Sequence, residues 1–270
     1  MRSGPKPRAC PAKVKQPHSA PSRHWTTSVR WGTRTGTGLL GSLVLAFGVP
    51  DRYGAAMSDY RPPDTPLDIL HDDHEILVVA KPSGLLSVPG KGEGLADCLI
   101  TRVQEAFPTA LLVHRLDRDT SGVMVFALSP HAQRHLGLQF EKRQVRKSYV
   151  ARLDGALAPA TGSVDLPIAV DWPNRPLQKI CHETGRAAQT EWRVLRQGDG
   201  ETRVRLMPRT GRSHQLRVHM LSLGHPILGD PLYATGPARD HPRLMLHSEE
   251  LRLRHPDGGR GMRFRARAPF

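Results

Sequence analysis

The sequence is poor in cysteine, and its three cysteines offer no site for a disulfide framework or a structural zinc ion. Cys10, Cys98 and Cys181 lie far apart, are odd in number, and form no Cys-x-x-Cys pair. Disulfide-stapled domains and zinc knuckles need cysteines at closer, paired spacings. Isolated cysteines of this kind are typical of proteins in a reducing compartment, so we expect a cytoplasmic location.

Long hydrophobic runs are also missing. The longest, LLGSLVLAFGV at residues 39–49, is shorter than the roughly 20 apolar residues that a membrane-spanning helix needs. We therefore expect no membrane partner. Hydrophobic residues still make up 38% of the chain, which is enough to build a packed core.

Acidic residues are scarce at the N-terminus. Residues 1–56 contain nine Lys or Arg and one acid, Asp51, so they carry +8 of the formal net charge of +14. This segment shows no sustained hydrophobic period. A signal or transit peptide, a basic arm that holds RNA, and a stretch that is not translated because synthesis starts at Met57 all fit it. We expect 1–56 to be a disordered basic extension and 57–270 to form the folded domain.

After Met57 the pattern is that of an α+β protein. Several expected strands follow one another directly, which favours a mixed, mostly antiparallel central sheet with flanking helices over alternating β–α–β units. The expected helices are 95–107, 131–142 and 213–223. The expected strands are 75–81, 123–128, 148–153, 189–195, 202–207, 244–255 and 262–266.

A dense group of ionisable residues lies between two of these strands. In LLVHRLDRDTSGVMVFALS, residues 111–129, two apolar runs flank His114, Arg115, Asp117, Arg118 and Asp119. Taken alone, this pattern fits a turn whose Asp and Thr side chains bind the local backbone. An active-site loop is the alternative.

A second basic group surrounds the start of the third expected helix. In PRTGRSHQLRVHM, residues 208–220, Arg209, Arg212, His214 and Arg217 lie where the free N–H groups of a helix favour phosphate. A solvated helix face would read the same way. No Cys or carboxylate lies near His214 and His219 at ligand spacing, so we expect no metal.

The third group combines basic residues with an aromatic one. In KRQVRKSYVARL, residues 142–153, Lys147 and Tyr149 share one expected strand. An aromatic ring beside basic side chains can stack on a nucleobase. A half-buried strand residue without any such role is equally compatible with the pattern.

Together, and in this order, these motifs resemble the RluA-type pseudouridine synthase family. The resemblance rests on HRLDRDTSG (114–122), KSYVA (147–151), TGRSHQLRVHM (210–220) and GHPILGD (224–230). KPSGLLSVPG at 81–90 and DWPNRP at 171–176 match as well, and the likeness spans about 67–270.

The resemblance implies a pseudouridine synthase fold with a basic cleft. It implies an enzyme that isomerises uridine to pseudouridine in structured RNA, with no cofactor and no metal. The RNA partners would be stem-loops, a loop of large-subunit rRNA and a tRNA anticodon stem-loop. A monomer would suffice.

The resemblance also implies roles for single residues. Asp117 would be the essential carboxylate, Arg212 the arginine that orients it, and Tyr149 the residue that stacks on the detached uracil. Arg115 would fill the space that the flipped base vacates. The residues expected to bind RNA are Arg115, Arg118, Lys147, Arg209, His214 and Arg217.

Other functions remain open. A non-catalytic RNA-binding or ribosome-assembly protein on the same fold would be expected to lack Asp117 or Tyr149, and both are present. A glycosidase would usually need two carboxylates that flank the bond, and Asp119 is the only nearby second. A related synthase with another RNA target is a further alternative.

Overall fold

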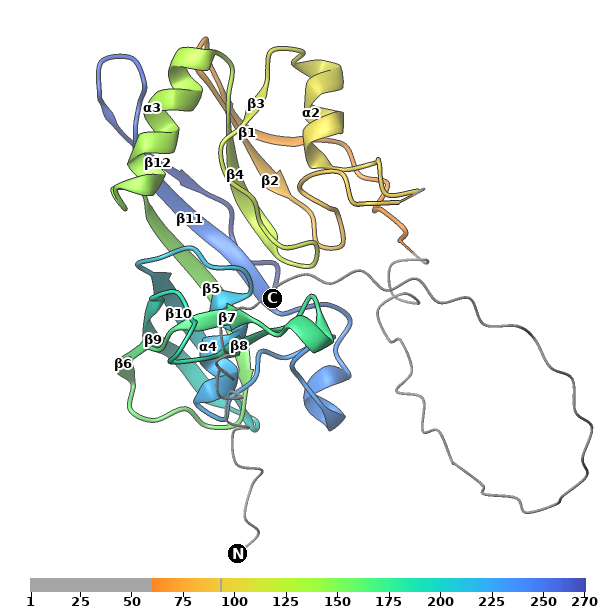
Figure 1. The fold of residues 1–270 in the computed structure, drawn as a ribbon, viewed down its shortest axis with the longest axis vertical. Helices are drawn as coiled ribbons and strands as arrows, with labels where there is room; N and C mark the ends of the chain where they lie inside the picture. Colours follow the sequence, from red (N-terminus) through yellow and green to blue (C-terminus); the bar gives the residue numbers. More distant parts are fainter. Residues whose placement is uncertain (1–59, 93) are drawn as a thin grey trace, which may run out of the picture. The chain divides into compact units, whose positions relative to one another are not determined.

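The computed structural model describes residues 60–92 and 94–270, and Tyr60–Phe270 forms one compact unit (Figure 1). The expected basic extension 1–56 lies outside the described residues, so its disorder and its start site stay predictions. Within the described part, none of the helices has the length and apolar character that crossing a bilayer would take.

Ten strands of the described residues form one sheet, and the other two form a separate hairpin. In chain order they are β1 (Asp68–Asp72), β2 (Ile76–Lys81), β3 (Leu111–Leu112), β4 (Ser121–Ala127), β5 (Arg146–Asp154), β6 (Thr161–Asp165), β7 (Ile168–Val170), β8 (Gln178–Ile180), β9 (Gln189–Gly198), β10 (Glu201–Pro208), β11 (Leu246–Arg254) and β12 (Gly261–Arg265). The order across the large sheet is β1-β2-β4-β11-β5-β10-β9-β6, with β12 beside β11 and β3 beside β4. β7 and β8 form the hairpin.

The sheet is mixed, because β4 and β11 pair in parallel while every other described pair in it is antiparallel. The expected α+β class with a mixed, mostly antiparallel sheet is therefore confirmed. The strand expected at 123–128 begins two residues earlier, since Ser121 and Gly122 pair with β11.

The helices are α2 (Leu99–Ala106), α3 (Pro130–Glu141) and α4 (Gln215–Ser222), with short 3-10 turns η1 (Trp172–Asn174) and η2 (Gly236–Arg239). α3 begins where Ser129 accepts the N–H of Ala132 through its hydroxyl, followed by a proline at the first helical position. In Figure 1, α2 and α3 lie beside the β1–β4 end of the sheet, and α4 lies with β5, β9 and β10.

Two apolar cores flank β2 and β4, which explains why both strands read as unbroken hydrophobic runs. Ile76 and Val78 face the core that α3 covers, and Leu77 and Val79 face the core that α2 covers. A further core lies between β5, β10 and α4 and contains Ala151, Leu153, Val204, Leu206, Leu216 and Met220. The molecule thus has two halves that meet where β4 pairs with β11.

Gly122 allows that meeting. Its φ is +112°, a conformation that L side chains rarely adopt, and a Cβ there would overlap the backbone of Ser248 on β11. The glycine that ends the HRLDRDTSG motif is therefore needed for the close approach of two strands.

We expect Gly122→Ala to lower the free energy of unfolding by at least about 2 kcal/mol, because the new methyl group adds steric overlap to an unfavourable φ. Gly137→Ala on α3 is the control: a Cβ at this position would meet nothing within 4 Å beyond its own stretch of helix, and alanine should stabilise the helix by about 0.5–1 kcal/mol. Urea unfolding of both variants measures the difference. Equal free energies of unfolding for the two variants would show that the fold does not depend on the close approach of β4 and β11 at Gly122.

Candidate active site

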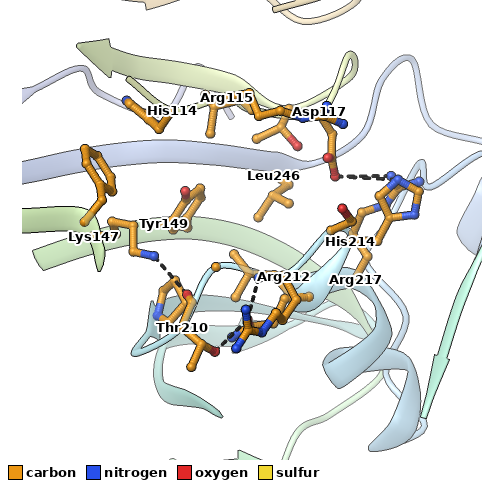
Figure 2. Close-up of a pocket in the computed structure, with 18 residues that line it drawn as sticks. His114, Arg115, Asp117, Lys147, Tyr149, Thr210, Arg212, His214, Arg217 and Leu246 are labelled. Carbon is orange, nitrogen blue, oxygen red and sulfur yellow. Dashed lines mark hydrogen bonds and ion pairs between the residues drawn. The ribbon is translucent and has the colours of Figure 1, made fainter. Parts of the chain in front are cut away.

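A cavity of about 440 Å³ opens between the loop before β4 and the segment that joins β10 to α4 (Figure 2). Seven of the nine residues proposed from the sequence line it: Arg115, Asp117, Lys147, Tyr149, Arg212, His214 and Arg217. Four of these are arginine or lysine, and Asp117 is the one carboxylate among the lining residues. The cavity is therefore a basic pocket built around a single acid.

The loop that carries Asp117 is a tight turn held from below by segment 81–87. The N–H of Thr120 donates to the carbonyl of Asp117 at 3.1 Å and closes the turn. Two hydroxyls of segment 81–87 donate to other carbonyls of this loop: Ser83 Oγ to Asp119 at 2.7 Å and Ser87 Oγ to Leu116 at 2.6 Å. These bonds fix the backbone on both sides of Asp117.

Lys81, at the end of β2, supports the same loop with a buried amino group. Its side chain is buried, and Nζ donates to the carbonyls of Pro82, Leu85 and Arg118 at 2.9, 2.6 and 2.8 Å. Burial lowers the pKa of Lys81 to about 7, against the opposing pull of the nearby aspartates. Three carbonyl acceptors match the three donors of an ammonium group.

Asp117 faces a buried arginine on α4. Nη1 of Arg217 lies 3.5 Å from Oδ2 of Asp117, while Nε and Nη2 bind the two carboxylate oxygens of Asp230 at 2.7 and 2.6 Å. The side chain of Arg217 is 3% exposed and that of Asp230 0%. Burial alone would lower the pKa of Arg217, but the ion pair with Asp230 outweighs it and the pKa is raised. The guanidinium therefore stays charged and points one donor at Asp117.

His214 closes the other side of Asp117. Its φ of +52° is left-handed, and Nε2 lies 4.0 Å from Oδ2 of Asp117. Nδ1 hydrogen-bonds the hydroxyl of Tyr233 at 2.7 Å. Burial lowers the pKa of His214 despite the charge of Asp117, so the ring is neutral at neutral pH.

Tyr149 lies inside the pocket on β5, between the loop of Asp117 and the segment of Thr210 and Arg212 (Figure 2). Burial raises the pKa of Tyr149 to about 12, so its phenol is protonated at neutral pH. The half-buried ring presents a flat apolar surface inside a basic cavity. Such a surface suits a planar heterocycle.

Lys147 and Arg115 add positive charge to the walls. Nζ of Lys147 donates to the carbonyl of Thr210 at 2.8 Å, and burial lowers the pKa of Lys147 to about 8. Arg115 is exposed and lies two residues before Asp117. Both line the cavity, Lys147 from β5 and Arg115 from the loop before β4.

The expectation that Arg212 orients Asp117 is wrong. Nε of Arg212 donates instead to the carbonyl of Ala187 at 3.1 Å, and the guanidinium next to Asp117 belongs to Arg217. The helix begins at Gln215, two residues later than expected, after the left-handed turn at His214. That turn directs Arg212 to the pocket rim and brings Arg217 inside.

Two residues expected to bind RNA do not line the pocket. Arg118 binds the carboxylate of Asp119 at 2.9 and 3.2 Å, and Arg209 binds that of Glu191 at 2.8 and 3.0 Å. Asp119 is engaged in this pair and does not form a second carboxylate of the cavity. RNA binding by Arg118 and Arg209 outside the pocket stays a prediction.

Sequence reasoning missed Asp230, Tyr233 and Lys81. A signal for the first was present: Arg217 lies among apolar residues of a helix, and a buried arginine needs a carboxylate, which Asp230 offers at the end of GHPILGD. Lys81 is the last residue of the buried strand β2. Nothing in the sequence distinguishes Tyr233 from an ordinary surface tyrosine.

Comparisons with known proteins agree with this geometry. The family model described as RNA pseudouridylate synthase matches residues 75–222. The dual-specificity RNA pseudouridine synthase RluA of Escherichia coli (strain K12) is 56% identical over 217 residues, 79% of this chain and 99% of that protein. Its namesake in Yersinia pestis is 55% identical over 204 residues, 75% of this chain and 99% of that protein.

Solved structures extend the likeness to the fold. Human RNA pseudouridylate synthase domain containing 1 is similar with a TM-score of 0.65 and 29% identity, over 78% of this chain and 87% of the human chain. Human RNA pseudouridylate synthase domain containing 4 is similar with a TM-score of 0.61 and 27% identity, over 75% of this chain and 88% of the human chain.

We expect Arg217→Ala to cost about 3–5 kcal/mol of folding free energy, because it leaves the charge of Asp230 buried without its partner. Arg212→Ala is the matched control in the same pocket and should cost about 1 kcal/mol or less, since it loses one hydrogen bond at a partly exposed site. Urea unfolding at neutral pH compares them. Similar costs for the two would contradict the assignment of Arg217 as the buried anchor.

Proposed function

The chain belongs to the RNA pseudouridylate synthase family and forms pseudouridine in RNA, and we propose that its targets are a uridine in a loop of large-subunit rRNA and one in a tRNA anticodon stem-loop. The proposal of two targets rests on the relatives named dual-specificity synthases, which align over 99% of their length. These relatives share about 55% of the aligned residues, and their names extend to this chain only as a proposal.

One observation carries the assignment of the site: a single carboxylate, Asp117, faces Arg217 in a pocket that otherwise contributes only cations and neutral groups. Pseudouridine formation breaks the N-glycosidic bond and joins C5 of uracil to the same ribose carbon. We propose one of two roles for Asp117. It acts at the ribose carbon, by bonding it or by stabilising positive charge there as the base departs, or it adds to the uracil ring. Each role needs an oriented, charged carboxylate, and the guanidinium of Arg217 supplies the orientation.

The detached uracil must stay in the pocket while it turns. The ring of Tyr149 supports a role as the surface on which the uracil stacks, since Tyr149 lines the cavity and its phenol is uncharged at neutral pH. The cations of the walls, Arg115, Lys147 and Arg212, suit phosphates next to the target and the polar edge of the base. None of these groups needs a metal ion to act.

The size of the cavity supports base flipping. About 440 Å³ lies in the range of sites that hold one small molecule. A double helix cannot enter such a space, so the target nucleotide has to leave its stack, as it does in other enzymes that act on bases. We propose that Arg115, which is exposed and lines the cavity, fills the gap that the flipped base leaves in the RNA.

The geometry disfavours the two other classes of function. A glycosidase with paired carboxylates lacks its second group here, because Asp119 is bound to Arg118 and does not line the pocket. A binding protein without catalysis would have no use for a buried arginine that aims at one carboxylate. An assay with uridine-labelled RNA separates the three classes: a synthase forms pseudouridine, a glycosidase releases free uracil, and a binding protein gives no reaction.

We also propose that the protein acts as a monomer in the cytoplasm. Cys98 is buried and belongs to no disulfide of the described residues, which suits a reducing compartment.

We expect Asp117→Asn to lower single-turnover pseudouridine formation by more than about 10³-fold, the scale on which an enzyme loses a nucleophile. RNA affinity should change little, because the cations and Tyr149 remain. Asp119→Asn is the control, and should cost about 1 kcal/mol of stability at most and leave substantial activity. An active Asp117→Asn beside an inactive Asp119→Asn would assign the chemistry to the other aspartate.

The two targets can be tested in cells. In a strain that lacks the gene, pseudouridine mapping should reveal one missing pseudouridine in a loop of large-subunit rRNA and one in a tRNA anticodon stem-loop. Wild-type enzyme on a plasmid should restore both, and Asp117→Asn should restore neither. Loss in one RNA class only would reduce the proposal to a single target, and no loss in either would refute it.

A further inference from the structure

A tryptophan stands exposed on the hairpin next to the pocket. Trp172, in the turn between β7 and β8, is 67% exposed, the highest value among the large hydrophobic side chains described. A lone apolar residue on a surface needs no explanation. Four features of its surroundings set Trp172 apart.

The first is a cation on its ring. The guanidinium carbon of Arg175 lies 4.7 Å from the centroid of the Trp172 ring, at cation–π distance. The guanidinium covers one face of the indole. The indole is otherwise largely exposed to water, so a second flat group can stack on it.

The second feature is the rigidity of the turn. Across it, the N–H of Asp171 donates to the carbonyl of Leu177 at 2.9 Å. The carboxylate of Asp171 accepts bonds from Asn174 at 2.9 Å and Lys179 at 3.0 Å. A turn closed by these bonds loses little conformational entropy when a ligand binds.

The third feature is the attachment of the hairpin to the pocket wall. Leu177 and Ile180 pack against an apolar cluster that includes Val218 of α4, the helix that carries Arg217. The N–H of Gln178 donates to the hydroxyl of Tyr233 at 2.9 Å, and that hydroxyl also binds His214 of the pocket. The turn with Trp172 is thus a fixed extension of the wall beside Asp117.

The fourth feature is charge. Nε of Arg212 at the pocket rim donates to the carbonyl of Ala187, the residue that follows Arg186, so the two arginines lie on adjoining segments. Burial lowers the pKa of Arg212, and the positive charge of Arg186 lowers it further, which is the sign of repulsion between them. Arg186 belongs to the strand-like segment that bonds Ile168 of β7. Glu183 is the acid of the adjoining loop. A polyanion that passes from the pocket to the hairpin would relieve this repulsion.

We propose that Trp172 stacks on an unpaired nucleotide of the substrate RNA, outside the pocket that holds the target uridine, with Arg175 behind the indole and the phosphates along Arg212 and Arg186. The inference rests on the proposed RNA substrate and adds a second base-binding site to it. A protein partner fits less well, since one exposed ring among arginines is far smaller than a stable protein interface.

The test uses the full chain and a synthetic RNA stem-loop of the tRNA anticodon type. Trp172→Ala should raise the Kd for this RNA about tenfold, in the range that removal of a base-stacking aromatic costs. Trp172→Phe keeps an aromatic face and should stay within about threefold of wild type. Leu138→Ala on α3 is the control. It removes another apolar side chain, which is 46% exposed and lies on a helix that packs on β2 and β4 and not on the β7–β8 hairpin, and it should leave the Kd unchanged.

A spectroscopic readout separates stacking from a structural effect. A base stacked on indole quenches its fluorescence, so RNA should quench wild-type emission more than that of Trp172→Phe, although both bind. A Kd of Trp172→Ala within twofold of wild type, or equal quenching in wild type and Trp172→Phe, would overturn the inference.

The same samples keep this inference distinct from the proposed function. Pseudouridine formation by the wild type is measured beside the binding. Wild type that forms pseudouridine while Trp172→Ala binds normally would refute the second site alone. Wild type that binds and is quenched without forming pseudouridine would refute the proposed target and support the stacking site.

Discussion

The site depends on one buried ion pair. Arg217 and Asp230 are both withdrawn from water, and two charges can be buried together only when each satisfies the other. Asp230 also accepts the N–H groups of Leu232 and Tyr233 through Oδ1, at 2.9 and 3.1 Å, so it is anchored to its own turn. Nη1 of Arg217, which Asp230 does not engage, is then directed at Asp117 with little freedom to move. Because one guanidinium serves both carboxylates, the stability of α4 and the orientation of the reactive group are coupled.

The pocket also depends on how the two halves of the molecule meet. Asp117 belongs to the half around β2 and β4, where segment 81–87 binds its loop. Arg217 belongs to the half around β10 and α4. The parallel contact of β4 with β11 joins them, and Gly122 sets its closeness. A rigid sheet that runs through both halves holds partners that lie 100 residues apart in the chain.

The larger elements were predictable because their hydrophobic patterns are strong. β2, β4, β5, β10 and α3 lie within a few residues of their expected positions. β1, β6 and the β7–β8 hairpin were not expected. They are short or largely exposed, so their residues carry little periodic signal. β6 pairs with β9, which lies more than 20 residues further along the chain, so its position is not set locally.

The site shows the same division. The sequence by itself determined the chemistry: motifs that place one aspartate, one tyrosine and a group of cations in a folded domain, and the family to which they belong. Only the tertiary structure decided which arginine serves the aspartate. Arg212 and Arg217 are alike in a linear motif, and burial on α4 beside Asp230 separates them. The tertiary structure alone also brings the turn of Trp172 beside the pocket. Charge and residue type are written in the chain, but the cost of burying a charge, and therefore its partner, depends on atoms that are distant in sequence and close in space.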